Sequence, residues 1–246
     1  MANAAAAGHA LRALTHLASR AEPIPAAHLA RAIGLPRSST YHLLAVLVEH
    51  GYVVHYEDER TYGIGAAVHE LGAGYQRQDP LQRLARPLVE RLVDSTTHNA
   101  HLAVLSGRDV LYVIEERAAG RPSLVTDVGV RLPATVTASG LAMLAALPRR
   151  QVTALYPSAS VMVTDGPATP SALRRELVDV RARGYALERG SVSPDLSSVA
   201  SAVLDRDDHP VAAVAITFRH DGVDEGGLAR LAQAARRTAE LVSTRL

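Results

Sequence analysis

One stretch near the N-terminus restricts the possible folds more than any other part of this sequence. Its apolar residues are spaced for two short helices, over Pro25–Ile33 and over roughly 37–50. The Gly-Leu-Pro sequence at 34–36 separates them, because glycine favours the left-handed end of a helix and proline cannot continue one. Two strand-like runs follow, Tyr52–Glu57 and Thr61–Ile64, joined by a charged turn. Helix, tight turn, helix and hairpin is the plan of a winged helix-turn-helix, which places its second helix in the major groove of DNA.

The start of the second helix carries side chains that suit DNA contacts. Guanidinium, hydroxyl, phenol and imidazole groups reach phosphate oxygens and base edges. The alternative is that the serines only cap the helix, but capping requires a single hydroxyl. At the hairpin tip an arginine is a candidate for a minor-groove or phosphate contact, although such a residue is as often simply solvated. The predicted DNA-contacting residues are Arg37, Ser38, Ser39, Thr40, Tyr41, His42 and Arg60. The second half of the helix presents an apolar stripe of Leu43, Leu44, Leu47 and Val48.

Charge argues in part against this interpretation. Residues 1–78 contain six arginines and six acidic residues, whereas a nucleic-acid-binding domain usually has a basic excess. The acidic residues concentrate near the wing, at 57–59, which leaves Arg31 and Arg37 near the start of the second helix. A dimer also doubles the contacts. We therefore expect moderate affinity for DNA with a strong dependence on salt.

The rest of the chain alternates strands and helices. A first helix is expected over Ala10–Ser19 after a frayed tail, a connector helix over 66–78, and a helix that Asp79 and Pro80 open and that runs to about Asp94. Further helices are expected at Ala138–Leu147, Ser171–Arg183 and Glu225–Arg245, and strands at His101–Leu105, Val110–Glu115, Ser123–Val128, Tyr185–Glu188, Ser198–Leu204 and Val211–Phe218. Helices beside a largely antiparallel sheet indicate the α+β class. We predict a DNA-binding domain over 1–65, the connector over 66–78 and a second domain over 79–246.

Composition excludes several classes of function. All 26 basic residues are arginine and cysteine is absent, which removes lysine and thiol nucleophiles, disulfides and thiolate metal sites. No apolar run approaches the ~20 residues of a membrane span, so we expect no membrane contact and a cytoplasmic location. No G-x-S-x-G, H-E-x-x-H or G-x-G-x-x-G signature occurs. His98 and His101, with only Asp94 nearby, are the nearest approach to a ligand set, and we predict neither a metal nor a cofactor.

Three stretches resemble one known family. The sequence LPRSSTYHLLAVLVEHGYV, with the hairpin and AAVHELG after it, is similar to the DNA-binding domain of IclR-type bacterial transcription regulators. RLPATVTASGLAMLAALP (131–148) and RARGYALERGSVSPDLSSVASAVLD (181–205), followed by PVAAVAITF, resemble the effector domain of that family. The resemblance covers nearly the entire chain in order. It implies a GAF-like second domain with a small-molecule pocket, a homodimer or dimer of dimers, and operator binding that a ligand modulates.

Hydroxyl groups mark the candidate pocket. Three of them gather where a loop enters a helix, whose N-terminus favours anions, and two lie among apolar residues of strands, where a buried hydroxyl needs a partner that a ligand can supply. A hydroxyl bonded to its own backbone is the simple alternative at each position. The resemblance adds a carboxylate at Glu188, and it leaves the effector open, because Ala215 stands where a serine can occur and a serine where a cysteine can. The predicted effector-binding residues are Thr135, Thr137, Ala138, Ser139, Glu188, Ser198, Ala215 and Thr217.

These observations predict a non-enzymatic transcription regulator, most often a repressor, whose partners are a double-stranded DNA operator and a small organic effector. A hydrolase or isomerase built on the second domain is the main alternative, but no set of nucleophile, base and orienting group can be named for it. A ligand sensor that acts through protein contacts, without DNA, is the third possibility.

Overall fold

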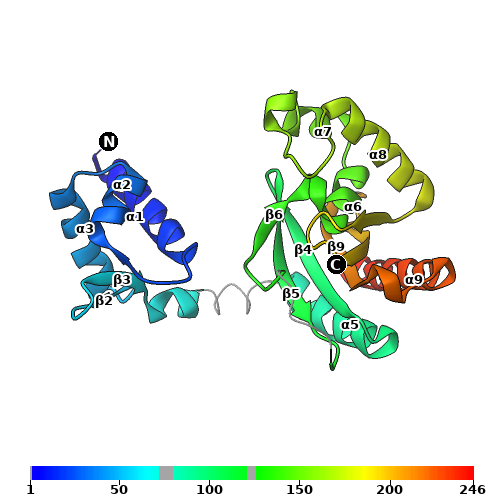
Figure 1. Ribbon diagram of the computed structural model, residues 1–246, viewed down its shortest axis with the longest axis horizontal. Helices are drawn as coiled ribbons and strands as arrows, with labels where there is room; N and C mark the ends of the chain where they lie inside the picture. The colour runs from blue at the N-terminus through cyan, green and yellow to red at the C-terminus, as the bar shows by residue number, and fades with distance from the viewer. Residues whose placement is uncertain (1, 72–79, 121–125) are drawn as a thin grey trace. The chain divides into compact units, whose positions relative to one another are not determined.

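The chain forms two compact units, Met1–Gln78 and Asp79–Leu246, in a computed structural model that describes residues 2–71, 80–120 and 126–246 (Figure 1). Each unit has its own hydrophobic core and is described by itself. Within the described ranges no helix is both long and apolar enough to cross a membrane.

The N-terminal unit is a winged helix-turn-helix, as predicted. It contains α1 (Ala2–Ala18), β1 (Ile24–Pro25), α2 (Ala26–Ile33), α3 (Arg37–Glu49), β2 (Val53–Tyr56) and β3 (Thr61–Ile64). The strands form an antiparallel sheet in the order β1-β3-β2. Gly34 ends α2 with a left-handed φ of 70°, which glycine adopts without steric cost. The predicted start of the first helix at Ala10 was wrong, because alanine is the best helix former and the alanine-rich start extends α1 back to Ala2.

The core of this unit lies between the helices and the sheet. Leu29 of α2 and Leu44 of α3 are fully buried, and Val53 of β2 packs in the same cluster. The predicted apolar stripe of α3 was right for Leu44 and Leu47 and wrong for Val48, which is 37% exposed. The buried positions of α3 are Thr40, Leu44 and Leu47. Their spacing of four and three residues defines one face of a helix, and Val48 lies beside that face.

The C-terminal unit is built on one antiparallel sheet. Its strands are β4 (Asn99–Ser106), β5 (Asp109–Glu116), β6 (Arg131–Pro133), β7 (Ala186–Arg189), β8 (Leu196–Leu204) and β9 (Pro210–Arg219), in the order β6-β5-β4-β9-β8-β7. The predicted strand over Ser123–Val128 lies partly outside the described residues, and its remainder, 126–128, is not a strand. The edge strand is instead β6, which pairs with β5.

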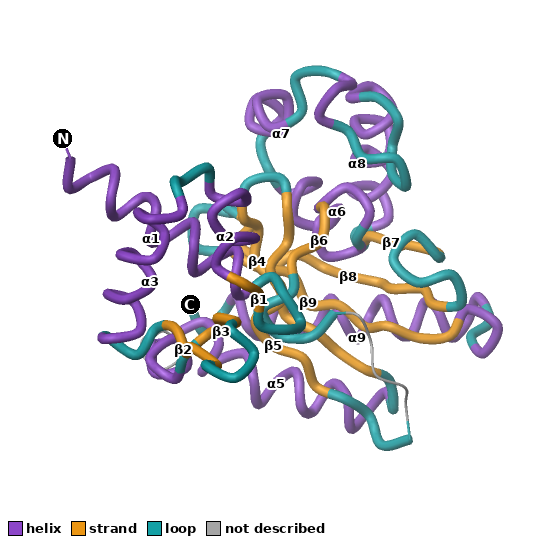
Figure 2. Tube along the Cα trace, turned by 60° about the vertical axis from the view of Figure 1, so that its left-hand side comes forward, coloured by secondary structure: helices purple, strands orange, loops and turns teal. Residues whose placement is uncertain are grey.

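Helices cover both faces of this sheet (Figures 1 and 2). On one face α5 (Pro80–Thr96) and α9 (Glu225–Ser243) pack on large side chains such as Val214 and Ile216 of β9. The other face carries α6 (Ala138–Ala146), α7 (Arg149–Leu155) and α8 (Pro170–Arg183), of which α7 was not predicted. Short 3-10 turns complete the unit at Ala134–Val136, Ala159–Val161 and His220–Gly222. The fold is therefore α+β, as expected.

Small residues allow α6 to lie close to the sheet. Ala213 and Ala215 of β9 and Ala200 of β8 face α6, which is itself alanine-rich. At Gly140 a Cβ atom would stand 2.1 Å from the Ala134 carbonyl oxygen, so no other residue fits without a backbone shift. This close approach brings the N-terminal turn of α6 against the strands that carry the candidate pocket.

Candidate DNA interface and effector pocket

The start of α3 presents the predicted DNA-contacting side chains to solvent. Arg37, Ser38, Ser39, Tyr41 and His42 are exposed, and Tyr41 is 54% exposed. Neither serine caps the helix, because Pro36 is the N-cap residue and no side chain bonds there. Within the described part of the chain Arg37 forms no ion pair. The capping alternative therefore does not hold for Ser38 and Ser39, and these exposed groups are available to bind a partner.

Thr40 is a correction to the predicted interface. Its side chain is fully buried, and its hydroxyl donates to the Pro36 carbonyl oxygen at 3.0 Å. It belongs to the face of α3 that packs on the core and is removed from the candidate contacts. Sequence alone could not separate it from its neighbours, because every residue from 37 to 42 is polar or amphipathic.

The wing ends in a turn that holds Arg60 in an unusual backbone conformation. The φ angle of Arg60 is 53°, and its N–H donates to the Glu57 carbonyl oxygen at 3.2 Å. Left-handed backbone costs a non-glycine residue about 1–2 kcal/mol. Beneath the turn, His55 of β2 and Tyr62 of β3 stack with ring centroids 4.3 Å apart. The guanidinium is exposed at the tip of the hairpin.

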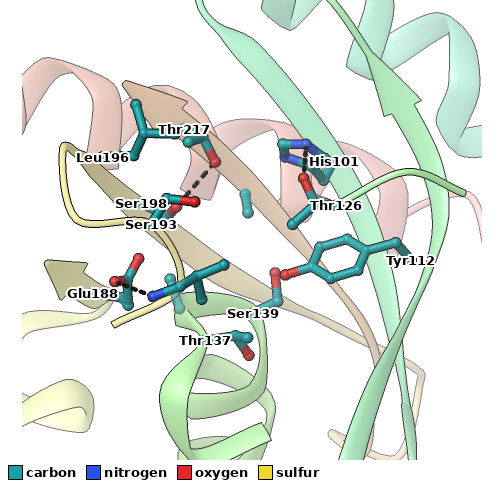
Figure 3. Close-up of a pocket in the computed structure, with 13 residues that line it drawn as sticks. His101, Tyr112, Thr126, Thr137, Ser139, Glu188, Ser193, Leu196, Ser198 and Thr217 are labelled. Carbon is teal, nitrogen blue, oxygen red and sulfur yellow. Dashed lines mark hydrogen bonds between the residues drawn. The ribbon is translucent and has the colours of Figure 1, made fainter. Parts of the chain in front are cut away.

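In the second unit, strand register aligns three of the predicted effector-binding residues. Glu188 of β7 pairs with Ser198 of β8, and Ser198 pairs with Thr217 of β9. Directly paired residues of antiparallel strands face the same side, so these side chains form one row across the sheet. The Ser198 and Thr217 hydroxyls are 2.9 Å apart and hydrogen-bonded (Figure 3).

The N-terminal turn of α6 forms the opposite wall. Thr137 caps it by accepting a hydrogen bond from the Gly140 N–H at 3.0 Å. The next hydroxyl, Ser139 Oγ, is buried without a hydrogen-bond partner among the described residues, and the Tyr112 phenol points toward it (Figure 3). Burial raises the pKa of Tyr112 and the charge of Glu188 raises it further; the nearby Ser139 hydroxyl, which faces the phenol without meeting hydrogen-bond geometry, offsets only part of this rise. Tyr112 is therefore a neutral phenol that can donate or accept.

A buried histidine closes the inner end. His101 of β4 is 1% exposed, its Nε2 lies 2.9 Å from the Thr126 hydroxyl, and it pairs in register with Ala215. Burial, and then the nearby charge of Arg117, lower its pKa to about 4. Glu115 lies 4.0 Å from Nε2, too far for a close ion pair, and its carboxylate accepts from Arg117 at 3.0 and 3.1 Å instead. His101 is thus neutral at physiological pH.

Glu188 supplies the acidic group of this pocket. Its carboxylate accepts from the backbone N–H groups of Ser191, at 2.5 Å, and Val192, at 3.3 Å. Burial nevertheless raises its pKa, because desolvation outweighs those hydrogen bonds and the one from Ser198. No arginine lines the pocket among the described residues. The cavity measures about 20 Å³, room for little more than one water molecule.

Seven of the eight predicted effector-binding residues line this one cavity. Thr135 is the exception: it is buried in the 3-10 turn before α6 and does not reach the cavity. The sequence reasoning missed six lining residues: His101, Tyr112, Thr126, Val192, Ser193 and Leu196. The period-two alternation of β4 places His101 on one face of the sheet, but only its pairing with β9 shows that this face is the pocket. No group of three or more metal-ligating side chains occurs among the described residues, so His98 and His101 do not belong to such a group.

Comparison with known proteins shows the class of protein to which the chain belongs. The profile of the bacterial transcriptional regulator IclR C-terminal domain matches residues 73–244, and that of the IclR helix-turn-helix domain matches residues 6–56. Such proteins are DNA-binding transcription regulators. The chain belongs to the IclR family, which confirms the resemblance found in its sequence.

Individual members of the family are similar to this chain over most of its length. The transcriptional repressor IclR of Escherichia coli is 24% identical over 217 residues, which cover 84% of this chain and 77% of that protein. The glycerol operon regulatory protein of Streptomyces coelicolor is 27% identical, over 87% of this chain and 82% of that protein. An IclR homolog from Microbacterium hydrocarbonoxydans, solved in complex with 4-hydroxybenzoate, superposes with a TM-score of 0.80 at 22% identity and covers 98% of both chains.

Proposed function

We propose that the chain is a repressor whose binding to an operator is released by a small organic effector in the Glu188–Ser198–Thr217 pocket. One observation carries the proposal: seven of the eight residues predicted to form an effector pocket, which lie between positions 137 and 217 of the sequence, line a single cavity. The exposed start of α3 supplies the DNA-reading surface. The repressors among the relatives, such as that of Escherichia coli, support the sign of regulation.

The proposed DNA contacts are Arg37, Ser38, Ser39, Tyr41 and His42 of α3, with Arg60 at the wing. The N-terminal unit is formally neutral, so a single copy gains little from phosphate neutralisation. We therefore expect the operator to be bound by a homodimer or a dimer of dimers, with half-sites about one helical turn of DNA apart or a multiple of it. Because its operator DNA lies in the cytoplasm, we expect the protein to act there.

The lining residues favour a particular ligand chemistry. Glu188 and the hydroxyls of Ser198 and Thr217 accept hydrogen bonds, while the first N–H groups of α6 and the neutral Tyr112 phenol can donate them. A compact molecule with a hydroxyl at one end and a carbonyl or carboxylate at the other would satisfy both walls. The relative solved with 4-hydroxybenzoate supports this class of ligand. Because the cavity is small, binding requires a wall to move, and we propose that this wall is the loop between β7 and β8, which carries Val192 and Ser193 and contains no helix or strand.

Replacing Ser198 by leucine tests the proposal. The longer side chain would occupy the cavity, so Ser198→Leu should bind operator like the unliganded wild type and lose its response to effector. Ser160→Leu is the matched control, since it makes the same substitution at an exposed position that does not line the cavity. The measurement is fluorescence anisotropy on the DNA upstream of the gene, titrated with small hydroxylated organic acids and beginning with 4-hydroxybenzoate.

Two results would contradict the proposal. If wild-type protein does not bind its upstream DNA, the result favours the alternative of a ligand sensor that acts through protein contacts. If Ser198→Leu still responds to an effector that releases the wild type, the effector binds elsewhere.

A further inference from the structure

Helices α7 and α8 lie at one end of the C-terminal unit (Figures 1 and 2). Between them is a groove lined mainly by arginine and apolar side chains. Arg149 projects from the first turn of α7, and Arg174, Arg175 and Arg181 project from α8. Arg174 and Arg181 are seven residues apart and therefore lie on one face of α8, and Arg175 lies beside Arg174 at the edge of that face. The only acidic side chain that lines it, among the described residues, is Asp179.

The positive charge of this groove is not neutralised within the described part of the chain. None of its four arginines takes part in an ion pair there. Burial and the neighbouring charge of Arg149 both lower the pKa of Arg181, so these two guanidinium groups repel each other. An anion between them would relieve that repulsion. Surface arginines that merely aid solubility have no need to converge on one concavity.

The groove also has an apolar floor and sufficient size for an organic ligand. Val152 and Leu177 are buried at its base, and Val178 is 48% exposed along it. Its volume is about 460 Å³, within the range of about 300–1,000 Å³ typical of small-molecule sites. An apolar base with a cationic rim fits a molecule that has an organic body and an anionic end.

From this geometry we infer that the α7–α8 groove binds a phosphorylated small molecule. Arginine recognises phosphate through paired, charge-assisted hydrogen bonds, and a phosphate monoester carries about −1.5 to −2 charges near neutral pH. A single carboxylate would leave most of the arginine charge unbalanced, whereas a diphosphate matches the excess of four arginines over one aspartate. The site is separate from the effector pocket and does not depend on the function proposed for it.

One contact links the two sites. The Arg181 Nε–H donates to the Ala145 carbonyl oxygen at 2.6 Å, at the C-terminal end of α6. The N-terminal turn of the same helix lines the effector pocket. Since α6 has nine residues, the two ends lie about 13 Å apart. A ligand that draws Arg181 into the groove would therefore act on a helix that also forms the pocket wall.

The test is calorimetric titration of the full-length protein with inorganic pyrophosphate and with adenosine diphosphate, at physiological ionic strength. We expect one saturable site per chain for both probes, and tighter binding of the nucleotide because its organic part covers the apolar floor. The double variant Arg174→Gln/Arg175→Gln should weaken binding at least about tenfold, given the strength of charge-assisted pairs. Arg83→Gln/Arg91→Gln removes the same charge from exposed positions of α5 and should leave binding within about twofold, as expected of screened surface charges.

Several results would overturn the inference. It fails if neither probe binds saturably, or if both double variants lose affinity equally, since the effect would then be general electrostatics. It also fails if Arg174→Gln/Arg175→Gln binds both probes as the wild type does. If that variant then binds random duplex DNA less well, or changes its oligomeric state, the arginines contact DNA or another subunit instead. Arg149→Gln gives an independent variant from the other helix, and unfolding curves establish that each variant is folded.

Discussion

Replacing Arg37 by alanine tests the proposed DNA interface at its most defined position. Arg37 is the first residue of α3, is exposed, and forms no ion pair within the described part of the chain. Its removal should therefore change the free energy of unfolding by no more than about 0.5 kcal/mol, as for most surface substitutions. Any larger effect on DNA binding then reports the contact itself and not the fold.

The expected loss follows from two copies of one contact. A good arginine–base contact provides about 1–3 kcal/mol of discrimination. A dimer on two half-sites presents the residue twice, so operator binding should weaken by about 2–6 kcal/mol, which is at least about 30-fold in Kd. His42→Ala should have a smaller effect in the same direction, because a single imidazole lacks the forked geometry of the guanidinium.

Fluorescence anisotropy over a series of salt concentrations is the assay, with Arg12→Ala on α1 as a control of equal charge. A base contact would be lost selectively on the operator, whereas a phosphate contact would weaken all sequences and reduce the salt slope by about one per contact. Operator affinity unchanged by Arg37→Ala, or lost equally in Arg12→Ala, would refute the assignment of α3 as the reading helix.

Two further predictions concern the same unit. Residues 1–78 alone should bind operator about 100-fold more weakly than the full chain at the same salt, because the isolated domain lacks the second reading head; equal affinity in a titration would contradict this. Arg60→Gly should leave the free energy of unfolding unchanged or raise it by up to about 1 kcal/mol, since glycine relieves the positive φ, while it weakens DNA binding. Chemical denaturation and anisotropy measure the two effects, and unchanged DNA affinity would mean that the wing arginine is only solvated.

Local signals were sufficient for most of the architecture. The break at 34–36 and the apolar spacing of α3 predicted the helix-turn-helix, and the Asp-Pro start placed the helix that begins at Pro80. Local sequence patterns failed where strand pairing or packing against other elements determines the structure. The strand expected at Ser123–Val128 is absent over its described part, 126–128, and the edge strand that pairs with β5 is Arg131–Pro133, which local signals did not predict. Thr40 looked like its polar neighbours until the helix face was known.

The pocket shows a similar division. Residues of the α6 loop and of β8 and β9 were predictable, since hydroxyls among apolar residues stand out in the sequence. His101 and Tyr112 were not, because the face of β4 that lines the pocket is known only from its pairing with the distant β9, and a register shift between Leu102 and Ala103 changes how β4 aligns with β5. Thr126 joins them through its bond to His101, a contact between segments 25 residues apart.

Glu188 offers a test in which function and stability should move in opposite directions. Its pKa lies above the usual 4.5, because burial outweighs the hydrogen bonds it accepts, so the folded state favours the neutral form. This contribution to stability is fully present below about pH 4.5 and is lost as the pH rises through the raised pKa.

Glu188→Gln keeps an acceptor oxygen and carries no charge. Urea unfolding should therefore show equal stabilities near pH 4 and a more stable variant at pH 7, while the variant responds less to effector. All other titrating groups are common to both proteins and largely cancel in the difference. A stability difference independent of pH would show that the Glu188 carboxylate is not strained by burial, and a normal effector response would show that the ligand does not depend on its charge.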